Sequence, residues 1–196
     1  MDTIRNFKYK KIEKFLNTSE VNLLKDYCRI RHRINKSGFD IQQSKTLDTM
    51  FYGDPLMESL LINKKEKMQE LTGLKLLPTY AFWRMYTKFA DLKKHSDRPS
   101  CEISVTVNIG GDGTSWPFLV DKSSIDLKPG DAVLYLGCEV EHWRDEFQGD
   151  WFAQTFLHYV DAEGPYKEYW KDGRLKWGEE KIPTNMRRDF NPKEVK

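Results

Sequence analysis

The sequence predicts an α+β fold in which a helical N-terminal layer precedes a compact all-β core. Two observations predict it. Apolar residues recur at helical spacing in the first third of the chain, and β-branched and aromatic residues dominate short runs between turns in the part that follows. With 196 residues, 39% of them hydrophobic, the chain can bury the core of one domain. We therefore expect a single domain with helical support in 1–75, a β core in 76–162 and a polar tail in 163–196.

Composition argues against several classes of protein. The 32 basic and 30 acidic residues nearly cancel, whereas a dedicated nucleic-acid binder usually carries a basic stripe. No stretch approaches the ~18 continuous apolar residues of a membrane span, and the N-terminus lacks the apolar run of a signal peptide. Cys28, Cys101 and Cys138 are odd in number and show no metal-binding spacing. We expect buried free thiols and a cytoplasmic protein without a membrane partner.

Two helices are expected in the N-terminal layer. Thr18 or Ser19 can cap a helix over 20–34, because a hydroxyl accepts hydrogen bonds from the free N–H groups of a first turn. Asp54-Pro55 is a stronger start signal for a second helix, which should end at Gly73.

The strands are expected after residue 76, separated by the glycine turns of 110–113 and 128–131. The expected strands cover 80–89, 102–109, 131–136 and 151–160, with a further short strand around 44–49. In the tail, the expected anchors on the body are Tyr166, Tyr169, Trp170 and Trp177.

A set of metal-binding side chains stands in this strand-rich region. In a strand, residues two apart project on the same face, so His95 and Asp97 can bind one ion, and His142 follows a later strand. Two imidazoles and one carboxylate suit a facial triad for non-haem Fe(II), which leaves the opposite positions open. The alternative for His95 is a surface histidine after Lys93-Lys94.

The residues around this set resemble the Fe(II)- and 2-oxoglutarate-dependent oxygenases, particularly the prolyl 4-hydroxylase-like branch. The resemblance covers roughly 79–161. Tyr86 stands on the strand before His95, the run LKPGDAVLY at 127–135 leads into the distal histidine, and an aromatic strand follows Gly149-Asp150.

The resemblance implies a double-stranded β-helix (jelly-roll) core with the N-terminal helices packed on one sheet. His95, Asp97 and His142 would form the catalytic metal centre. Fe(II), 2-oxoglutarate and O2 would be used, with ascorbate as an optional reductant, and 2-oxoglutarate would be decarboxylated to succinate. Asp97 favours hydroxylation over halogenation, because related halogenases lack this carboxylate.

The substrate would be a C–H bond of a prolyl or other peptidyl residue, or of a free amino acid or small metabolite. Nucleic-acid dealkylation is disfavoured, since the relatives that perform it carry arginines along the closing strand and this strand has none.

One position departs from the family. Most members have an Arg or Lys at the start of the closing strand that pairs with the distal carboxylate of 2-oxoglutarate, and this chain has Trp151 and Phe152 there. A buried dicarboxylate without a cation is costly. Arg144, two residues after His142, is the predicted substitute, because its planar fork can bind a carboxylate. The alternative is a surface arginine paired with Asp145 or Glu146.

The remaining candidates share a strand face with these residues or flank them. Arg84 and Lys88 are the reserve cations on the face of Tyr86, while a structural role is expected for His158. Further 2-oxoglutarate contacts are expected from Asn108, Thr106 and Ser104, and substrate walls from Trp116, Trp143 and Trp151, for which core packing is the alternative.

Two other classes of protein remain open because the closing strand lacks a cation. One is a non-catalytic, cupin-like β-helix that binds a metal in a structural or sensory role. The other is a cupin-like metalloenzyme that does not use 2-oxoglutarate.

Overall fold

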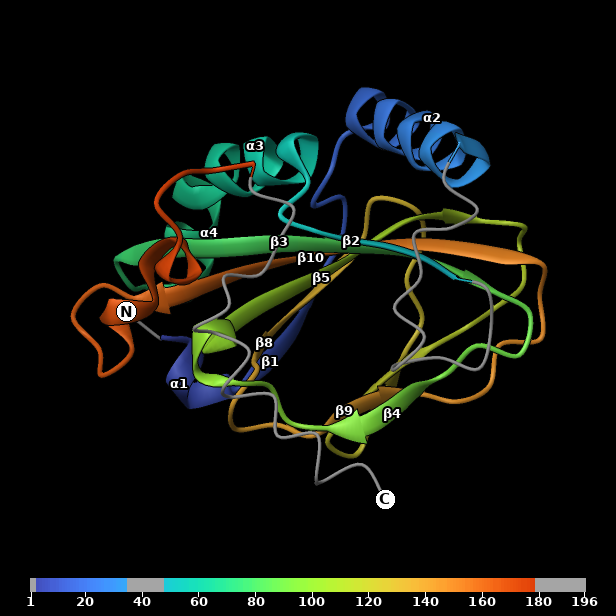
Figure 1. Ribbon diagram of the computed structural model, residues 1–196. Helices are drawn as coiled ribbons and strands as arrows, with labels where there is room; N and C mark the ends of the chain where they lie inside the picture. The colour runs from blue at the N-terminus through green and yellow to red at the C-terminus, as the bar shows by residue number, and fades with distance from the viewer. Residues whose placement is uncertain (1–2, 35–47, 179–196) are drawn as a thin grey trace, which may run out of the picture.

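The computed structural model describes residues 3–34 and 48–178, and its core is formed by two antiparallel sheets. The larger sheet has the strand order β1-β8-β5-β10-β3-β2, and the smaller has the order β4-β9-β6-β7. Figure 1 shows α2, α3 and α4 on one side of the larger sheet, with β4 and β9 of the smaller sheet on its other side. The α+β jelly-roll architecture is confirmed, as is the packing of the N-terminal helices on one sheet.

The strands are β1 (Tyr9–Ile12), β2 (Thr49–Tyr52), β3 (Leu76–Thr87), β4 (Leu92–His95), β5 (Ile103–Gly111), β6 (Phe118–Val120), β7 (Ser123–Ile125), β8 (Ala132–Leu136), β9 (His142–Arg144) and β10 (Trp151–Asp161). The α-helices are α1 (Ile4–Phe7), α2 (Thr18–Ile34), α3 (Pro55–Asn63) and α4 (Lys65–Thr72). A 3-10 turn covers Pro99–Cys101, and Lys167–Gly173 contains 3-10 turns interrupted by a kink at Trp170, Lys171 and Asp172.

The helix α2 starts with a capping box. The Glu20 backbone N–H donates to Asn17 Oδ1 at 2.9 Å, and the Asn17 backbone N–H donates to Glu20 Oε2 at 2.9 Å. Two donors that the first turn leaves free are thereby satisfied reciprocally. The prediction of Thr18 or Ser19 as the cap was wrong, because the carboxylate three residues after Asn17 closes this box.

The second predicted helix is divided into α3 and α4 at Lys64. Its start is confirmed, since Asp54 Oδ1 accepts hydrogen bonds from the backbone N–H groups of Leu56 and Met57 at 3.0 and 3.2 Å. Its end is also confirmed, since Gly73 adopts the left-handed conformation at φ 70° and its N–H donates to Gln69 O.

The first 75 residues contribute more than helices, because they supply both edge strands of the larger sheet. β1 pairs with β8 and β2 pairs with β3. β1 was not predicted. Of the strand expected around 44–49, residues 44–47 lie outside the described residues, and β2 begins at Thr49.

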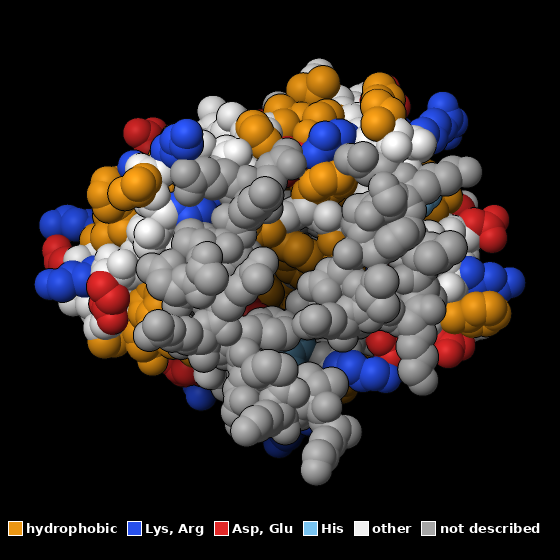
Figure 2. Space-filling view, viewed as in Figure 1, with side chains coloured by type: hydrophobic (Ala, Val, Ile, Leu, Met, Phe, Trp, Pro, Cys, Tyr) orange, Lys and Arg blue, Asp and Glu red, His pale blue; other side chains and the backbone are white. Residues whose placement is uncertain are grey.

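The two faces of the larger sheet have different chemistry. Side chains alternate along a strand, so Val105 and Val107 of β5 join the core under the helices. Ser104, Thr106 and Asn108 of the same strand face the smaller sheet. In Figure 2, hydrophobic side chains are visible near the centre of the molecular face. The polar candidates therefore lie inside the β core and not in the core beneath the helices.

The C-terminal segment up to residue 178 is attached to the body by buried charged groups. Arg98 Nη1 and Nη2 donate to the Asp172 carboxylate at 2.8 and 2.7 Å, and Arg174 pairs with Glu58 of α3. Trp177 packs against the main core as expected, whereas Trp170 is 49% exposed. The tail is polar, as predicted, but buried ion pairs hold its described part in place.

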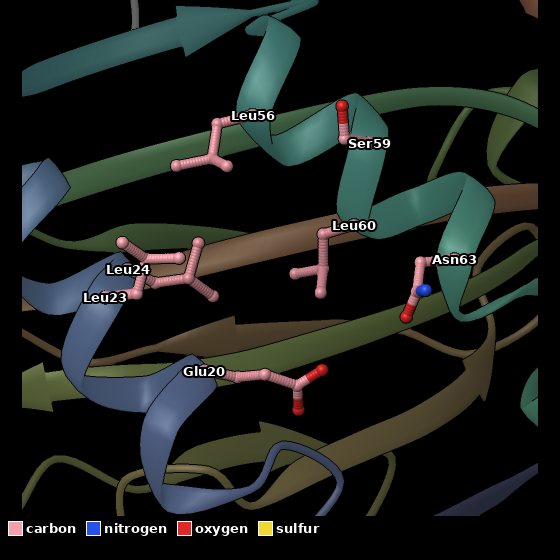
Figure 3. Close-up of a pocket in the computed structure, with 7 residues that line it drawn as sticks. All are labelled: Glu20, Leu23, Leu24, Leu56, Ser59, Leu60 and Asn63. Atoms are coloured by element: carbon pink, nitrogen blue, oxygen red, sulfur yellow. The ribbon is translucent and has the colours of Figure 1, made fainter.

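The helical layer carries an open groove between α2 and α3 (Figure 3). Leucines of both helices line it, and Leu23 is 61% exposed. In the described ranges, no helix combines the length and apolar character that crossing a membrane requires.

Candidate metal centre

The structure brings His95, Asp97 and His142 together on the smaller sheet. β4 and β9 pair antiparallel with His95 opposite His142, and the centroids of the two imidazole rings are 4.4 Å apart. Asp97 Oδ1 lies 3.5 Å from His95 Nε2 and 3.6 Å from His142 Nε2. One ligand atom from each residue lies within 4.8 Å of the other two. Three donors that converge in this way can bind one face of a metal ion.

Backbone carbonyls orient both imidazoles. His95 Nδ1 lies 2.6 Å from Lys93 O, and His142 Nδ1 lies 3.0 Å from Val140 O. A carbonyl oxygen only accepts hydrogen bonds, so Nδ1 carries the proton in each ring. The lone pair of each Nε2 therefore faces the Asp97 carboxylate, which is the arrangement of a metal-binding histidine.

Asp97 is held as a carboxylate in a space that a glycine leaves open. Burial raises the pKa of Asp97, but the neighbouring His142 and His95 imidazoles outweigh this effect and bring its pKa below the usual range. A Cβ on Gly137 would lie 2.5 Å from Asp97 Oδ2 and would also clash with Cys101 O. Gly137 O in turn accepts a hydrogen bond from the Asp97 backbone N–H at 2.8 Å.

Arg144 is buried in a cage of aromatic rings. Its guanidinium carbon lies 4.8 Å from the Trp116 ring, 4.9 Å from the Phe152 ring and 5.4 Å from the Phe118 ring. The side chain is 1% exposed, and burial lowers its pKa to about 10. The alternative of a surface arginine paired with Asp145 or Glu146 was wrong, because strand alternation turns Arg144 inward together with His142.

Arg144 also has donors that the described residues do not satisfy. Nη1 donates to Trp116 O, but Nε and Nη2 have no hydrogen-bond partner among residues 3–34 and 48–178, and no carboxylate there forms an ion pair with it. A buried cation without an anion is strongly unfavourable. An anionic ligand in this cage would supply the missing partner.

Further buried polar atoms on the inward face of the larger sheet lack partners in the part of the chain that the structure describes. They are Tyr86 Oη, Asn108 Oδ1 and Gln154 Oε1, from β3, β5 and β10. Burial raises the pKa of Tyr86, so its phenol keeps a proton to donate. Each buried polar group without a partner costs about 1–3 kcal/mol. Such groups in one interior are typical of a binding site for a polar ligand.

The two reserve cations are placed differently from Arg144. Arg84 is buried in an ion pair with Asp48, to which its Nε donates at 2.7 Å, while its guanidinium lies 4.1 Å from the Tyr86 ring. Lys88 follows the end of β3 and is exposed, with its ammonium 5.4 Å from the Phe89 ring. Arg84 thus already has a carboxylate partner, and Lys88 does not share the face of Tyr86.

The polar residues of β5 face the same interior as Arg84 and Tyr86. Thr106 Oγ1 accepts a hydrogen bond from Gln154 Nε2, and Asn108 Nδ2 donates to Leu127 O at 2.7 Å. The amide oxygens of Asn108 and Gln154 remain available to a ligand.

Of the three candidate wall tryptophans, the structure brings only Trp116 to this interior. Its ring lies 4.8 Å from the Tyr86 ring, and its Nε1 donates to Asp145 O at 2.8 Å. Trp143 points away from His142 and Arg144 and lies 5.0 Å from the Lys94 ammonium. Trp151 faces the helical layer, 5.7 Å from the Arg29 guanidinium. Phe152 occupies the inward position instead, as strand alternation from Gln154 could have indicated.

His158 lies next to Asp97, but it is occupied by a hydrogen bond. Its Nδ1 lies 2.8 Å from Ser104 Oγ, and its ring lies 4.5 Å from the Tyr80 ring. Asp97, Cys101 and His158 form a second group with ligand atoms within 4.8 Å of one another. Burial raises the pKa of Cys101 well above its usual range, so it remains a thiol and a poor ligand. No pattern in the sequence indicated the contact between His158 and Ser104.

The sequence matches no family model and no curated protein, but the structure is similar to solved structures. A prolyl-4-hydroxylase from Pseudomonas putida has 17% identity and a TM-score of 0.61, over 79% of this chain and 94% of that one. HygX from Streptomyces hygroscopicus, solved with nickel and 2-oxoglutarate bound, has 10% identity and a TM-score of 0.61, over 80% and 83%. The non-heme alpha ketoglutarate dependent epimerase SnoN from nogalamycin biosynthesis has 12% identity and a TM-score of 0.66, over 92% and 93%. At these identities the similarity establishes the architecture: the chain has the double-stranded β-helix fold of the 2-oxoglutarate- and Fe(II)-dependent oxygenases.

Proposed function

We propose that the protein is an Fe(II)- and 2-oxoglutarate-dependent dioxygenase that hydroxylates a C–H bond. The observation that carries this proposal is the position of a buried, unpaired arginine beside a complete set of metal ligands. His142 and Arg144 face the same interior from one strand, and Arg144 lacks an anion among the described residues. A metal ion and a dicarboxylate together would satisfy both features.

His95, Asp97 and His142 are the residues that would hold Fe(II). Two neutral imidazoles and one carboxylate bind one face of the ion and leave the opposite positions for other ligands. When bound, Fe(II) and 2-oxoglutarate supply the activation of O2, as 2-oxoglutarate is converted to succinate and CO2. The protein's part is to keep this geometry and to exclude water from it.

Arg144 is proposed to bind the distal carboxylate of 2-oxoglutarate. Two residues along a strand span ~7 Å, which is comparable to the length of a five-carbon dicarboxylate that reaches from the metal to the guanidinium. Nε and Nη2 lie on one side of the fork and can donate to both oxygens of a carboxylate. Tyr86 Oη, which also lacks a partner among the described residues, is a third donor beside Arg144.

The aromatic cage supports this assignment. Trp116, Phe118 and Phe152 keep water from the guanidinium, and a charge-assisted hydrogen bond is stronger when it is desolvated. Asn108 and Thr106 are proposed as further contacts, since they line the interior from β5. Arg84, neutralised by Asp48, is the less suitable cation.

For the substrate we propose a prolyl or other peptidyl residue, supported by the likeness to the Pseudomonas prolyl-4-hydroxylase. A small-molecule substrate is the second candidate, supported by the likeness to SnoN over 92% of this chain. Candidate peptides and metabolites, added one at a time to the turnover assay below, distinguish the two by a gain of one oxygen atom in the product.

The proposed function is tested by O2-dependent turnover of 2-oxoglutarate. Purified protein with Fe(II) and 2-oxoglutarate should form succinate, measured by NMR or mass spectrometry, even without the substrate and at a slow rate. His142→Ala should abolish this conversion, and exclusion of O2 should do the same. No succinate from the wild-type protein with any candidate substrate would contradict the proposal and favour a non-catalytic metal-binding role.

A further inference from the structure

The two carboxylate oxygens of Asp97 face different neighbours. Oδ1 lies 3.5 and 3.6 Å from the Nε2 atoms of His95 and His142. Oδ2 lies 3.4 Å from the hydroxyl of Ser104 on β5. Oδ1 is therefore the oxygen that faces the two imidazoles, and Oδ2 is the oxygen in contact with Ser104.

The Ser104 hydroxyl lies within reach of three groups. They are His158 Nδ1 at 2.8 Å, Cys101 O at 3.0 Å and Asp97 Oδ2 at 3.4 Å. A hydroxyl has one proton to donate, and the carbonyl and the carboxylate can only accept it. All three contacts are satisfied when the Nδ1–H of His158 donates to Ser104 Oγ and the hydroxyl proton is directed at the two other acceptors.

The imidazole of His158 is held in place by its surroundings. It is 4% exposed, its ring lies 4.5 Å from the Tyr80 ring, and it stacks on the Phe156 ring at 6.4 Å with an interplanar angle of 5°. Nδ1 is the ring nitrogen directed at Ser104.

We propose that His158 and Ser104 are positioning residues for the metal ligand Asp97. The Nδ1–H of His158 fixes the Ser104 hydroxyl, whose proton is shared between Cys101 O and Asp97 Oδ2, and Asp97 then presents Oδ1 alone to the metal. This inference rests on the proposed function, because it requires a metal at the three ligands. A carboxylate that binds through one oxygen leaves positions for the two oxygens of 2-oxoglutarate and for O2.

The chain offers a matched set of variants. His158→Asn places an amide N–H where Nδ1 lies, whereas His158→Gln places it near the position of Nε2. His158→Phe keeps an aromatic ring between Tyr80 and Phe156 but has no donor, and Ser104→Ala removes the hydroxyl. Thr155→Val is the control, because Thr155 is a buried residue of β10 that faces away from Asp97 and donates to Phe82 O.

The readout is the affinity of the full chain for Mn(II) or Fe(II) without O2, measured by titration, together with the thermal unfolding of the metal-free protein. Loss of a group that orients a metal ligand typically lowers metal affinity about 10- to 100-fold. His158→Phe and Ser104→Ala should each show such a loss. The double variant should lose little more metal affinity than either single variant, because the two residues act on Asp97 through one series of hydrogen bonds. The metal affinity of His158→Asn should stay within about threefold of the wild-type value, well short of the tenfold loss expected for the other variants. Thr155→Val should bind metal as tightly as the wild type.

The outcomes separate this inference from the proposed function. A wild-type protein that binds no metal contradicts the proposed function itself. Wild-type affinity in Ser104→Ala and His158→Phe, with the wild type binding metal, overturns only the positioning role. If His158→Phe does not fold, the comparison of His158→Asn with His158→Gln decides: tighter metal binding by His158→Asn supports the role, and equal affinities overturn it.

Discussion

His142 and Arg144 face the same interior from consecutive inward positions of β9, but their surroundings differ. His142 stands opposite His95 at the cluster of ligands, while Arg144 lies among aromatic rings and has two donors without a partner in the described residues. One short strand thus carries both a proposed metal ligand and a buried cation. This spacing is the reason for assigning the distal carboxylate of 2-oxoglutarate to Arg144.

Substitution of Arg144 should separate the binding of 2-oxoglutarate from the binding of iron. A hydrogen bond to a charged group contributes about 1.5–3 kcal/mol, so Arg144→Ala should weaken 2-oxoglutarate binding by at least about tenfold at nearly unchanged Fe(II) affinity. Arg144→Lys should recover only part of the loss, because an ammonium lacks the planar fork. Both affinities can be measured by anaerobic titration calorimetry. The exposed Lys88→Ala is the control, and equal losses of both ligands in Arg144→Ala would contradict the assignment.

Gly137→Ala should damage the metal centre directly. The added Cβ would lie 2.5 Å from Asp97 Oδ2, so the carboxylate has to move away from the two histidines. Metal affinity should fall by about tenfold or more, as measured by anaerobic titration. Gly113→Ala is the control, since its Cβ would meet no atom within 4 Å although its φ is +100°. That variant should be strained and less stable but should bind metal normally, and equal metal affinity in the two variants would refute the prediction.

His158 should make the metal-free protein sensitive to acid. Its pKa is about 4 in the folded protein, against 6.5 for an ordinary histidine. Between these values the unfolded chain binds a proton that the folded chain does not, so the free energy of unfolding falls as the pH is lowered from 6.5 to 4. The contribution is on the order of 3 kcal/mol.

Urea unfolding of wild type and His158→Asn at several pH values measures this contribution. The difference in unfolding free energy between the two proteins should change across the window from pH 6.5 to pH 4 and should be constant above it. Parallel pH dependences of the two proteins would show that His158 is not the group responsible.

The Arg174–Glu58 ion pair should stabilise the fold without affecting the metal centre. Both side chains are buried, and removal of one partner of such a pair typically costs about 3–5 kcal/mol. Arg174→Ala should therefore lower the unfolding free energy strongly while the folded protein keeps its metal affinity. The exposed Lys176→Ala should change neither quantity. A weak effect of Arg174→Ala on stability would show that the C-terminal segment is not held by this pair.

The strands β3, β5, β8 and β10 could be predicted because each one carries its own pattern, whereas the short strands β6 and β7 of the smaller sheet were not predicted. β5 alternates β-branched with polar residues, and the turn at 128–131 marks the start of β8. β1 has the sequence YKKI and shows no comparable pattern, because its pairing with β8 defines it as a strand. The cap of α2 was misassigned for a similar reason, since it depends on a reciprocal contact between Asn17 and Glu20.

The candidate site was predictable only where a local sequence pattern indicated it. The spacing of His95, Asp97 and His142 and the flanking motifs indicated the metal ligands; the structure brings the three side chains together, and metal binding stays a prediction. The burial of Arg144 could be inferred only from its two-residue spacing to His142. Its acidic neighbours Asp145 and Glu146 were equally compatible with an exposed arginine in a surface ion pair. The partners of Arg84 and Ser104 could not be predicted, since Asp48 and His158 lie 36 and 54 positions away in the chain.

The most direct test of the account is the visible absorbance of the protein with Fe(II) and 2-oxoglutarate in the absence of O2. If the three ligands hold iron and Arg144 holds the distal carboxylate, a weak charge-transfer band should appear and saturate with 2-oxoglutarate. The band should be absent in His95→Ala, and in Arg144→Ala it should require at least about tenfold more 2-oxoglutarate. No band from the wild-type protein at saturating Fe(II) and 2-oxoglutarate would show that the three ligands and Arg144 do not hold iron and 2-oxoglutarate together.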